Sequence, residues 1–205
     1  MNNERGFTLA EMLVVCAIVG LVMAGLLGLV MSGQQAYWFG TTQVDAQQTV
    51  RVAIERMVKE IREAGYYPRV PNAGPTCAAA PCYNFDAIGS GPTSSSLTLQ
   101  YDWDGDGNSA ASGTVTDPLQ LDPRGERVTY SFSSGVLTRR EIGVDGSPVT
   151  IASGISGLSF SFFAEDGTAT TAPANIRTVA VTVTAQTANQ GAYVTMSDRV
   201  RLRNR

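Results

Sequence analysis

The stretch that decides the fold runs from Arg5 to Met31 and reads RGFTLAEMLVVCAIVGLVMAGLLGLVM. Its final part, from Met12 to Met31, contains no charged residue. A helix rises about 1.5 Å per residue, so a segment of this length spans the roughly 30 Å hydrocarbon core of a bilayer. The sequence therefore predicts a membrane-spanning helix near the N-terminus. Arg5 precedes this segment and the next basic residue is Arg51, so the positive-inside rule places Met1 in the cytoplasm and the rest of the chain outside.

Two other interpretations of this segment are a signal peptide that is removed and a plain single-span anchor. The apolar run is longer than a usual signal-peptide core, and no small-x-small cleavage site closes it. Against a plain anchor stands Glu11, because a carboxylate costs about 2.5–3.5 kcal/mol at the centre of a membrane helix. Near the helix start Glu11 could instead reach the headgroups, so the acid alone leaves both possibilities open.

The residues Arg5-Gly6-Phe7-Thr8-Leu9-Ala10-Glu11, followed by the apolar run, closely resemble the class III signal of type IV prepilins and type II secretion pseudopilins. The resemblance implies that a prepilin peptidase cuts after Gly6 and methylates the new N-terminus at Phe7. It also implies that Glu11 pairs with the N-terminal amine of a neighbouring subunit, which would neutralise two groups that are costly in hydrocarbon. The implied partners are other pilins or pseudopilins and an inner-membrane assembly platform.

The sequence after the membrane segment predicts that the helix continues as an amphipathic stem. Val50, Ile54, Met57 and Ile61 recur at helical spacing, and charged residues including Glu60 surround that stripe. Gly65 and Pro68 predict the end of the helix, which would extend from Phe7 to Ala64. The expected organisation is a leader (1–6), a transmembrane or filament-core helix (7–31), an amphipathic continuation (32–65) and an extracytoplasmic β-rich domain (66–205).

The domain after Tyr66 has short runs typical of β-strands. The expected strands are 97–101, 127–132, 136–141, 158–163, 176–185 and 193–202. Ser134-Gly135 and Asp166-Gly167 predict turns between strands, so we expect an antiparallel sheet covering the apolar face of the stem. The fold class is thus α+β, with a long N-terminal helix packed on an antiparallel sheet. The pattern resembles PilW-type minor pilins and J-type pseudopilins, which share this pilin fold.

An aspartate-rich loop is a candidate calcium site. Asp102, Asp104 and Asp106 alternate and Gly107 follows them, which is the arrangement that lets a loop wrap oxygen ligands around Ca²⁺. The bidentate closing acid is missing, so Asp117, Asp122 or Glu126 would have to complete the site. The alternative is a solvated turn, which favours the same residues. No cofactor is required by this interpretation, and a bound Ca²⁺ would only stiffen the loop.

Composition sets the remaining expectations. The chain has no histidine, which excludes Ser-His, Cys-His and His-zinc chemistry. The sequence also has no evident nucleophile-base pair or phosphate loop, so we expect that the protein is not an enzyme. Cys77 and Cys82 sit close together in a loop, and this spacing permits a disulfide in an exported domain. Cys16 is interpreted as a packing residue.

The C-terminal arginines form a local basic pattern on a chain whose net charge is -3. Alternation in a strand would place Val200 and Leu202 on one face and the arginines on the other, namely Arg199, Arg201, Arg203 and Arg205. A polar face of a final strand is the commoner explanation of this pattern. We do not expect DNA as a partner, because no aromatic residues alternate with the arginines.

The resemblance implies a minor pilin that helps to initiate or extend a type IV pilus. It would reside in the bacterial inner membrane before assembly and in the filament afterwards. A type II secretion pseudopilin has the same leader and fold, so the sequence leaves that alternative open. A membrane-tethered adhesin or DNA-uptake module is a third possibility, in which outward loops supply the contact surface.

Overall fold

A computed structural model describes residues 8–67, 85–103, 109, 115–116, 123–187 and 193–204. The chain divides into two compact units, Met1–Val44 and Asp45–Arg205. One helix, α1 (Leu9–Glu63), contributes residues to both units. The predicted helix from Phe7 to Ala64 is confirmed in all but its ends. Leu9 is the first helical residue because Thr8 caps the helix, as described below.

In the second unit, one face of α1 forms the centre of the hydrophobic core. The predicted stripe of Val50, Ile54, Met57 and Ile61 is confirmed, since each of these side chains is at most 7% exposed. Ala53, Val58 and Ala64 widen the buried face beyond the predicted stripe. Burying apolar side chains relative to water stabilises a fold by about 25 cal/mol per Å². This stretch of α1 is therefore an integral part of the domain core.

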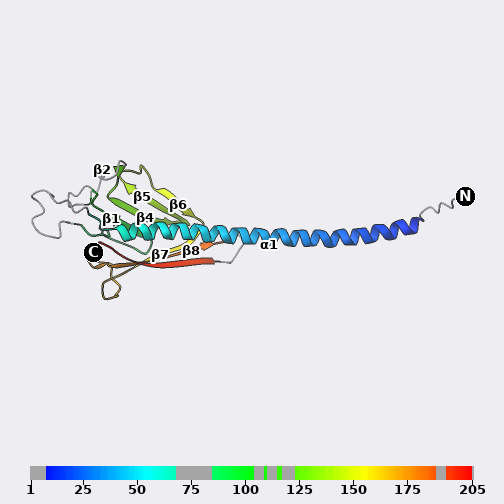
Figure 1. The fold of residues 1–205 in the computed structure, drawn as a ribbon. Coiled ribbons are helices and arrows are strands. Elements are labelled where there is room, and N and C mark those ends of the chain that lie inside the picture. Colours follow the sequence, from blue (N-terminus) through cyan, green and yellow to red (C-terminus); the bar gives the residue numbers. More distant parts are fainter. Residues whose placement is uncertain are drawn as a thin grey trace, which may run out of the picture. The chain divides into compact units, whose positions relative to one another are not determined.

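Two antiparallel sheets pack with this part of α1 in a single core (Figure 1). The first sheet has the order β1 (Ser96–Gln100), β4 (Arg127–Ser133), β5 (Val136–Ile142) and β6 (Val149–Ser153). The second has the order β7 (Ile155–Phe163), β8 (Thr178–Gln186) and β9 (Tyr193–Arg201). A short ribbon joins β2 (Val115–Thr116) to β3 (Pro123–Arg124), and a 3₁₀ turn, Pro173–Asn175, precedes β8. The α+β class is confirmed.

The expected antiparallel strands are divided between two main sheets, because the chain changes sheets between β6 and β7. Gly154 joins these two strands with a positive φ of 73°, a conformation that glycine adopts without strain. The loop before β1 bridges the two sheets through its backbone. The Phe132 amide of β4 donates to the Ser95 carbonyl, and the Phe160 amide of β7 donates to the Ser94 carbonyl. Strand β6 was missed because a polar turn separates its short run from β5.

The turn chemistry read from the sequence is confirmed at two positions. Ser134 and Gly135 both have positive φ, at 50° and 78°, as a two-residue type I′ turn requires between β4 and β5. At the other turn, Gly167 has a φ of 83° and the Asp166 carboxylate accepts hydrogen bonds from the Thr168 amide and hydroxyl. Ser134-Gly135 is the two-residue turn that sets the β4–β5 register, whereas Asp166-Gly167 shapes the longer connection between β7 and β8.

Candidate functional site

The start of α1 is closed by a reciprocal pair of side chains. The Thr8 amide and hydroxyl both donate to Oε2 of Glu11, at 2.9 and 2.8 Å, and the Glu11 amide donates to the Thr8 hydroxyl at 3.3 Å. This is a capping box, in which two residues three apart satisfy donors that the first turn of a helix leaves unpaired. Glu11, predicted as an assembly carboxylate, is thus also a local structural residue.

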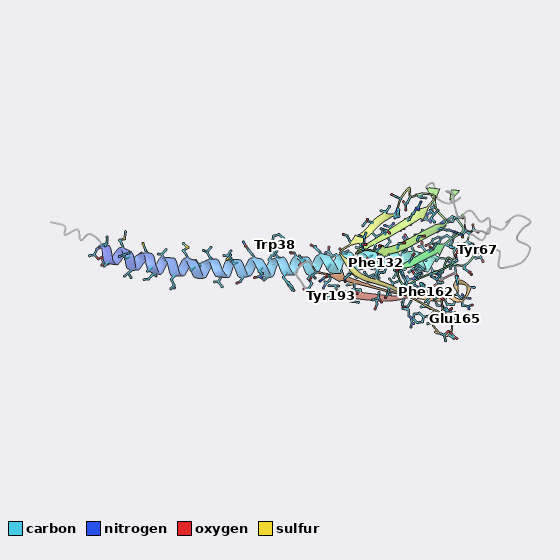
Figure 2. The ribbon with its side chains drawn as sticks, turned by 180° about the vertical axis from the view of Figure 1, so that it is seen from behind. Trp38, Tyr67, Phe132, Phe162, Glu165 and Tyr193 are labelled. Carbon is cyan, nitrogen blue, oxygen red and sulfur yellow. The ribbon has the colours of Figure 1, made fainter. Side chains whose placement is uncertain are left out.

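The part of α1 that follows the cap exposes its apolar side chains. Every residue from 8 to 40 is exposed, including Leu21 at 77% and Trp38 at 64% (Figure 2). Five glycines here have open space where a side chain would lie, and they are Gly20, Gly25, Gly28, Gly33 and Gly40. Among the described residues, α1 is the one helix long and apolar enough to cross a membrane. An uncovered apolar surface of this size indicates contact with lipid or other chains.

Several predicted site residues lie outside the described residues. They are Gly6 and Phe7 of the cleavage site, Cys77 and Cys82 of the expected disulfide, and Asp104, Asp106 and Asp117 of the expected calcium loop. Their proposed roles stay predictions.

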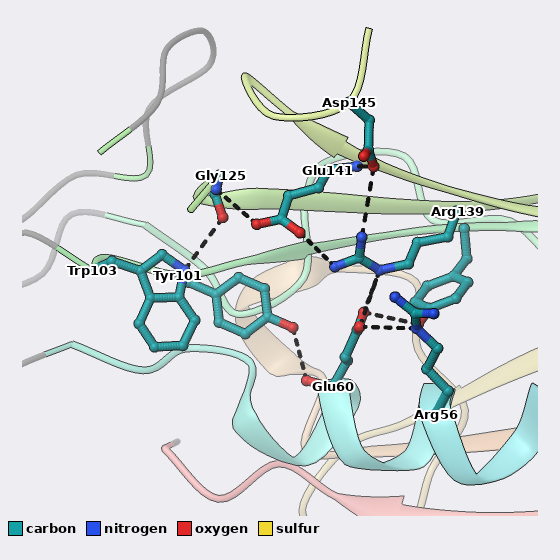
Figure 3. Close-up of polar contacts among 9 residues, drawn as sticks. Arg56, Glu60, Tyr101, Trp103, Gly125, Arg139, Glu141 and Asp145 are labelled. Carbon is teal, nitrogen blue, oxygen red and sulfur yellow. Dashed lines mark hydrogen bonds and ion pairs between the residues drawn. The ribbon is translucent and has the colours of Figure 1, made fainter. Parts of the chain in front are cut away.

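The most extensive polar contact of the domain joins α1 to the first sheet through Glu60 (Figure 3). The Glu60 carboxylate accepts hydrogen bonds from the Tyr130 hydroxyl at 2.8 Å and from Nε of Arg139 at 3.0 Å. Arg56, one turn earlier on α1, approaches the same carboxylate at 3.5 Å. The side chain of Glu60, one of the charged residues that surround the apolar stripe, is only 16% exposed, so its carboxylate is largely shielded from solvent.

Arg139 holds this group of charges together. Besides Glu60, its guanidinium binds Glu141 at 2.7 Å and approaches Asp145 at 3.6 Å. Burial opposes the charge of Arg139, but the hydrogen bond to Glu141 and the charge of Glu60 outweigh it, so its pKa is raised. Burial, followed by the adjacent charge of Glu60, also raises the pKa of the Tyr130 hydroxyl. The arrangement therefore keeps Arg139 charged and Tyr130 protonated, as a structural ion-pair network requires.

A second set of contacts extends from this network to Trp103 (Figure 3). The Glu141 carboxylate accepts from the Gly125 amide at 2.8 Å, and the Gly125 carbonyl accepts from the indole of Trp103 at 3.2 Å. A side chain at Gly125 would lie 2.2 Å from the Ile142 carbonyl oxygen, so only glycine fits there. The Trp103 amide donates to the Glu126 carboxylate at 2.9 Å. Trp103 is thus hydrogen-bonded to Gly125 and Glu126, which lie just before β4, and Gly125 is in turn bonded to Glu141 of β5.

The same loop base buries two carboxylates. Asp102 and Glu126 are each 1% exposed; Glu126 accepts from the Trp103 amide, and the Asp102 amide donates to the Tyr66 carbonyl. Glu126 is one of the three acids that the sequence offered to complete a calcium site. Within the described ranges, no group of three or more His, Cys, Asp or Glu residues is arranged to hold a metal ion. The structure thus brings two of the candidate oxygen donors to the start of the loop.

The end of α1 is closed by residues near the C-terminus. The side-chain amide of Asn204 donates to the Glu63 and Ala64 carbonyls at 3.0 and 3.4 Å, and the Arg203 amide donates to the Arg62 carbonyl at 3.3 Å. These bonds satisfy carbonyls that the last turn of a helix leaves without partners. The predicted alternation is confirmed, because Val200 and Leu202 are each 2% exposed while Arg199, Arg201 and Arg203 are exposed. Arg201 pairs with Glu165, and Arg199 lies over the Phe163 ring at 4.1 Å.

Sequence reasoning missed the capping role of Thr8 and the Glu60 network. Thr8-Leu9-Ala10-Glu11 fits the Ser/Thr-x-x-Glu pattern that precedes an apolar run, so the capping box was available as a signal. For Glu60 and Arg139 the sequence offers no comparable signal, because their pairing depends on the packing of α1 against β5.

A capped, exposed apolar helix continuing into an α+β domain defines a pilin-like protein, a class that is non-enzymatic. Residues 1–27 match the family described as the prokaryotic N-terminal methylation motif. The chain belongs to the family of prepilin peptidase-dependent protein B, which matches residues 40–202. No curated protein matches the chain. Family membership implies processing by a prepilin peptidase, and the hydrophobic helix with its methylation motif is consistent with an inner-membrane prepilin.

Proposed function

We propose that this chain is a minor pilin of a type IV pilus that contributes to initiation or assembly of the filament. The observation that carries the proposal is the exposed apolar length of α1 behind a methylation motif. A prepilin peptidase cuts after Gly6 and methylates Phe7, and the apolar part of α1 then leaves the inner membrane for the helical core of the filament. The open glycine positions support this, because small residues let helices approach closely in an apolar environment.

Glu11 serves assembly in this proposal by accepting the N-terminal amine of a neighbouring subunit. Its geometry supports that role, because both Thr8 donors use Oε2. Oε1 accepts no hydrogen bond from the residues that the structure describes. An ionised carboxylate has several acceptor sites, so an amine can bind at Oε1 while Thr8 keeps the helix capped. Pairing two charges in this way removes two isolated charges from an apolar core.

The first test is to express the full chain with and without a prepilin peptidase and to determine the mature N-terminus by mass spectrometry. An N-methylated Phe7 is expected with the peptidase, and an intact Met1 without it. Gly6→Leu should block cleavage, because a large side chain obstructs the scissile backbone. The matched control Gly20→Leu, far from the cleavage site, should be processed normally. Cleavage downstream of Met31 would withdraw the pilin proposal and indicate a secreted domain.

The phenotype of a deletion strain distinguishes a role in a type IV pilus from a role in a secretion pseudopilus. For a minor pilin we expect loss of surface pili with normal protein secretion, restored by the wild-type chain but not by Glu11→Ala. Loss of secretion with intact pili would assign the chain to a pseudopilus. Loss of adhesion or DNA uptake with filaments still present would instead favour a tethered binding module.

We also propose that the aspartate-rich loop binds a structural Ca²⁺ through Asp102, Asp104, Asp106 and a closing acid, for which Asp117 and Glu126 are candidates. The position of Glu126 supports this, because its carboxylate accepts a hydrogen bond from the Trp103 amide and so lies next to Asp102 at the start of the loop. A site filled at one hundred times its dissociation constant stabilises the fold by about 2.7 kcal/mol.

Calcium binding is tested by thermal unfolding of the full chain in neutral detergent, with CaCl₂, MgCl₂ or EDTA. CaCl₂ alone should raise the melting temperature, and Asp104→Asn should abolish the increase. Asp166→Asn removes a carboxylate that caps an unrelated turn and should leave the calcium response unchanged. An identical melting temperature in CaCl₂ and EDTA would establish a solvated turn.

A further inference from the structure

A cleft of about 300 Å³ lies beside Trp103, between the last turns of α1 and the first sheet. Its charged lining consists of Arg56, Lys59, Arg124 and Arg139, together with Glu60, Glu63 and Glu141. All of these residues belong to the unit Asp45–Arg205. The position is distinct from α1's apolar surface, so nothing in the proposed assembly role accounts for it.

Arg139 holds two of the three lining acids, whereas two of the four lining cations have no carboxylate partner among the described residues. Glu60 and Glu141 are both held by Arg139. In contrast, no carboxylate of the described residues lies within 4.0 Å of the ammonium of Lys59 or the guanidinium of Arg124. Arg56 reaches Glu60 only at 3.5 Å, with its side chain 48% exposed. Four cations and three acids line the cleft, and two of these cations, Lys59 and Arg124, remain available to a ligand on a chain whose net charge is -3.

Arg124 is held in an orientation suited to bind a carboxylate. Its guanidinium carbon lies 4.3 Å from the centre of the Trp103 ring, and this stacking leaves the N–H groups at the guanidinium edge available. Trp103 is itself fixed by the Gly125 carbonyl and the Glu126 carboxylate. A planar guanidinium on a rigid support can bind a carboxylate through two parallel hydrogen bonds. Little conformational entropy is then lost on binding.

We propose that this cleft docks an acidic segment of a neighbouring protein subunit, with Arg124 and Lys59 binding its carboxylates. An acidic sugar fits less well, because the Trp103 ring already contacts Tyr66 and Tyr101 at centroid distances of 5.0 and 5.1 Å in addition to Arg124. Little of the ring remains for a sugar to stack on. The volume suits one or two side chains, so the cleft selects a short acidic motif on the partner's surface.

The proposal is tested on the full chain in neutral detergent with Trp38→Phe, which leaves Trp103 as the sole tryptophan. The probe is a blocked peptide of three aspartates, and its neutral counterpart has three asparagines. We expect a saturable change in Trp103 fluorescence with the aspartate peptide alone. Lys59→Gln and Arg124→Gln should each weaken binding about tenfold, as loss of a charge-assisted contact does. Arg62→Gln, an exposed cation of the same helix outside the cleft, is the matched control.

Calorimetric titration with the same peptides provides a second measurement, because Arg124→Gln also changes the surroundings of Trp103. Equal binding of the asparagine peptide, or an equal loss with Arg62→Gln, would overturn the proposal. Binding that emerges only after Asp117→Asn and Asp122→Asn would show that the chain's own acids fill the cleft. Tighter binding of glucuronate than of the peptide would show an acidic-sugar site. None of these readouts depends on cleavage after Gly6, so the pilin proposal is tested separately.

Discussion

Arg139 is the residue on which the polar contact between α1 and the first sheet depends. Arg139→Met keeps most of the side-chain volume but leaves Glu141 and Asp145 without their cation and Glu60 with Arg56 alone. Removing one partner of a buried ion pair costs about 3–5 kcal/mol, because the remaining charge stays uncompensated. We expect a loss of about 3 kcal/mol or more in the free energy of unfolding, measured by urea denaturation in detergent.

Two variants control this prediction. Arg51→Met breaks the pair with Glu55, whose side chains are 73% and 62% exposed, and exposed pairs contribute at most about 1 kcal/mol. Combining Arg139→Met with Glu60→Gln should recover part of the loss, because one uncompensated charge is then removed. If Arg139→Met were as mild as Arg51→Met, the network would contribute nothing specific to stability.

Tyr130 makes stability sensitive to alkaline pH. Burial raises the pKa of its hydroxyl above the ordinary value of about 10, so above that pH the unfolded chain releases a proton that the folded chain retains. The contribution is fully present below pH ~10 and is lost as pH rises toward the raised folded-state pKa. We expect the urea unfolding free energy to fall above pH ~10 by about 1.4 kcal/mol per pH unit for this group.

Tyr130→Phe isolates this effect. The variant is less stable at neutral pH because it loses the bond to Glu60. Its unfolding free energy should fall less steeply above pH ~10 than that of the wild type, because one group fewer releases a proton on unfolding. Tyr193→Phe, at a side chain that is 60% exposed, should leave the slope unchanged. Parallel slopes for wild type and Tyr130→Phe would contradict the assignment.

At the residue scale, the sequence predicted what depends on local chemistry. Ser134 and Gly135 define their turn, and Val200 and Leu202 alternate with arginines, because φ preferences and strand periodicity act over a few residues. The sequence places Glu60 among the charged residues that surround the apolar stripe and does not indicate its partners. Its burial follows from Arg139 and Tyr130, which lie 79 and 70 residues away in the sequence. No local pattern encodes such a pair.

At the scale of the element, the capping box of α1 can be tested without assembly. Thr8→Val keeps the side-chain shape but removes the hydroxyl that accepts from the Glu11 amide. Loss of an N-cap costs about 1 kcal/mol, which corresponds to about fivefold faster amide exchange in the first turn. We expect this increase at Glu11 by hydrogen exchange in detergent micelles.

Thr41→Val is the matched control for the cap, because the Thr41 hydroxyl donates to the Trp38 carbonyl within the helix and caps nothing. Its substitution should leave exchange at Glu11 unchanged. Unaltered exchange in Thr8→Val would mean that the carboxylate of Glu11 alone suffices to hold the first turn.

The sheets show why elements are predicted more readily than their arrangement. Six strands were found from alternation, but β6 follows a polar turn and the division into two sheets depends on Gly154. The loop backbone at Ser94 and Ser95 then bridges both sheets. Periodicity gives the faces of a strand and does not say which strands share a sheet.

At the scale of the whole molecule, the unit from Asp45 to Arg205 should fold without the apolar segment, because α1 residues from Val50 onward complete its core. We expect a fragment of residues 45–205 to be soluble without detergent, with a cooperative urea transition. A fragment of residues 66–205 should not fold, because it lacks Ala64 and six buried residues of α1, namely Val50, Ala53, Ile54, Met57, Val58 and Ile61. Circular dichroism distinguishes the two, and a folded shorter fragment would contradict the core described here.

The bond from Asn204 to the Glu63 carbonyl joins residues that are 141 positions apart in the sequence. Contacts of such high sequence separation form late, since the entropy of closing a long loop is lost before any interaction is gained. If the domain is exported during synthesis, which proceeds from the N-terminus, the end of α1 emerges long before the residues that close it. The stem then spends the interval of translocation with its apolar face uncovered, and the domain becomes resistant to proteases only after residue 204 has arrived.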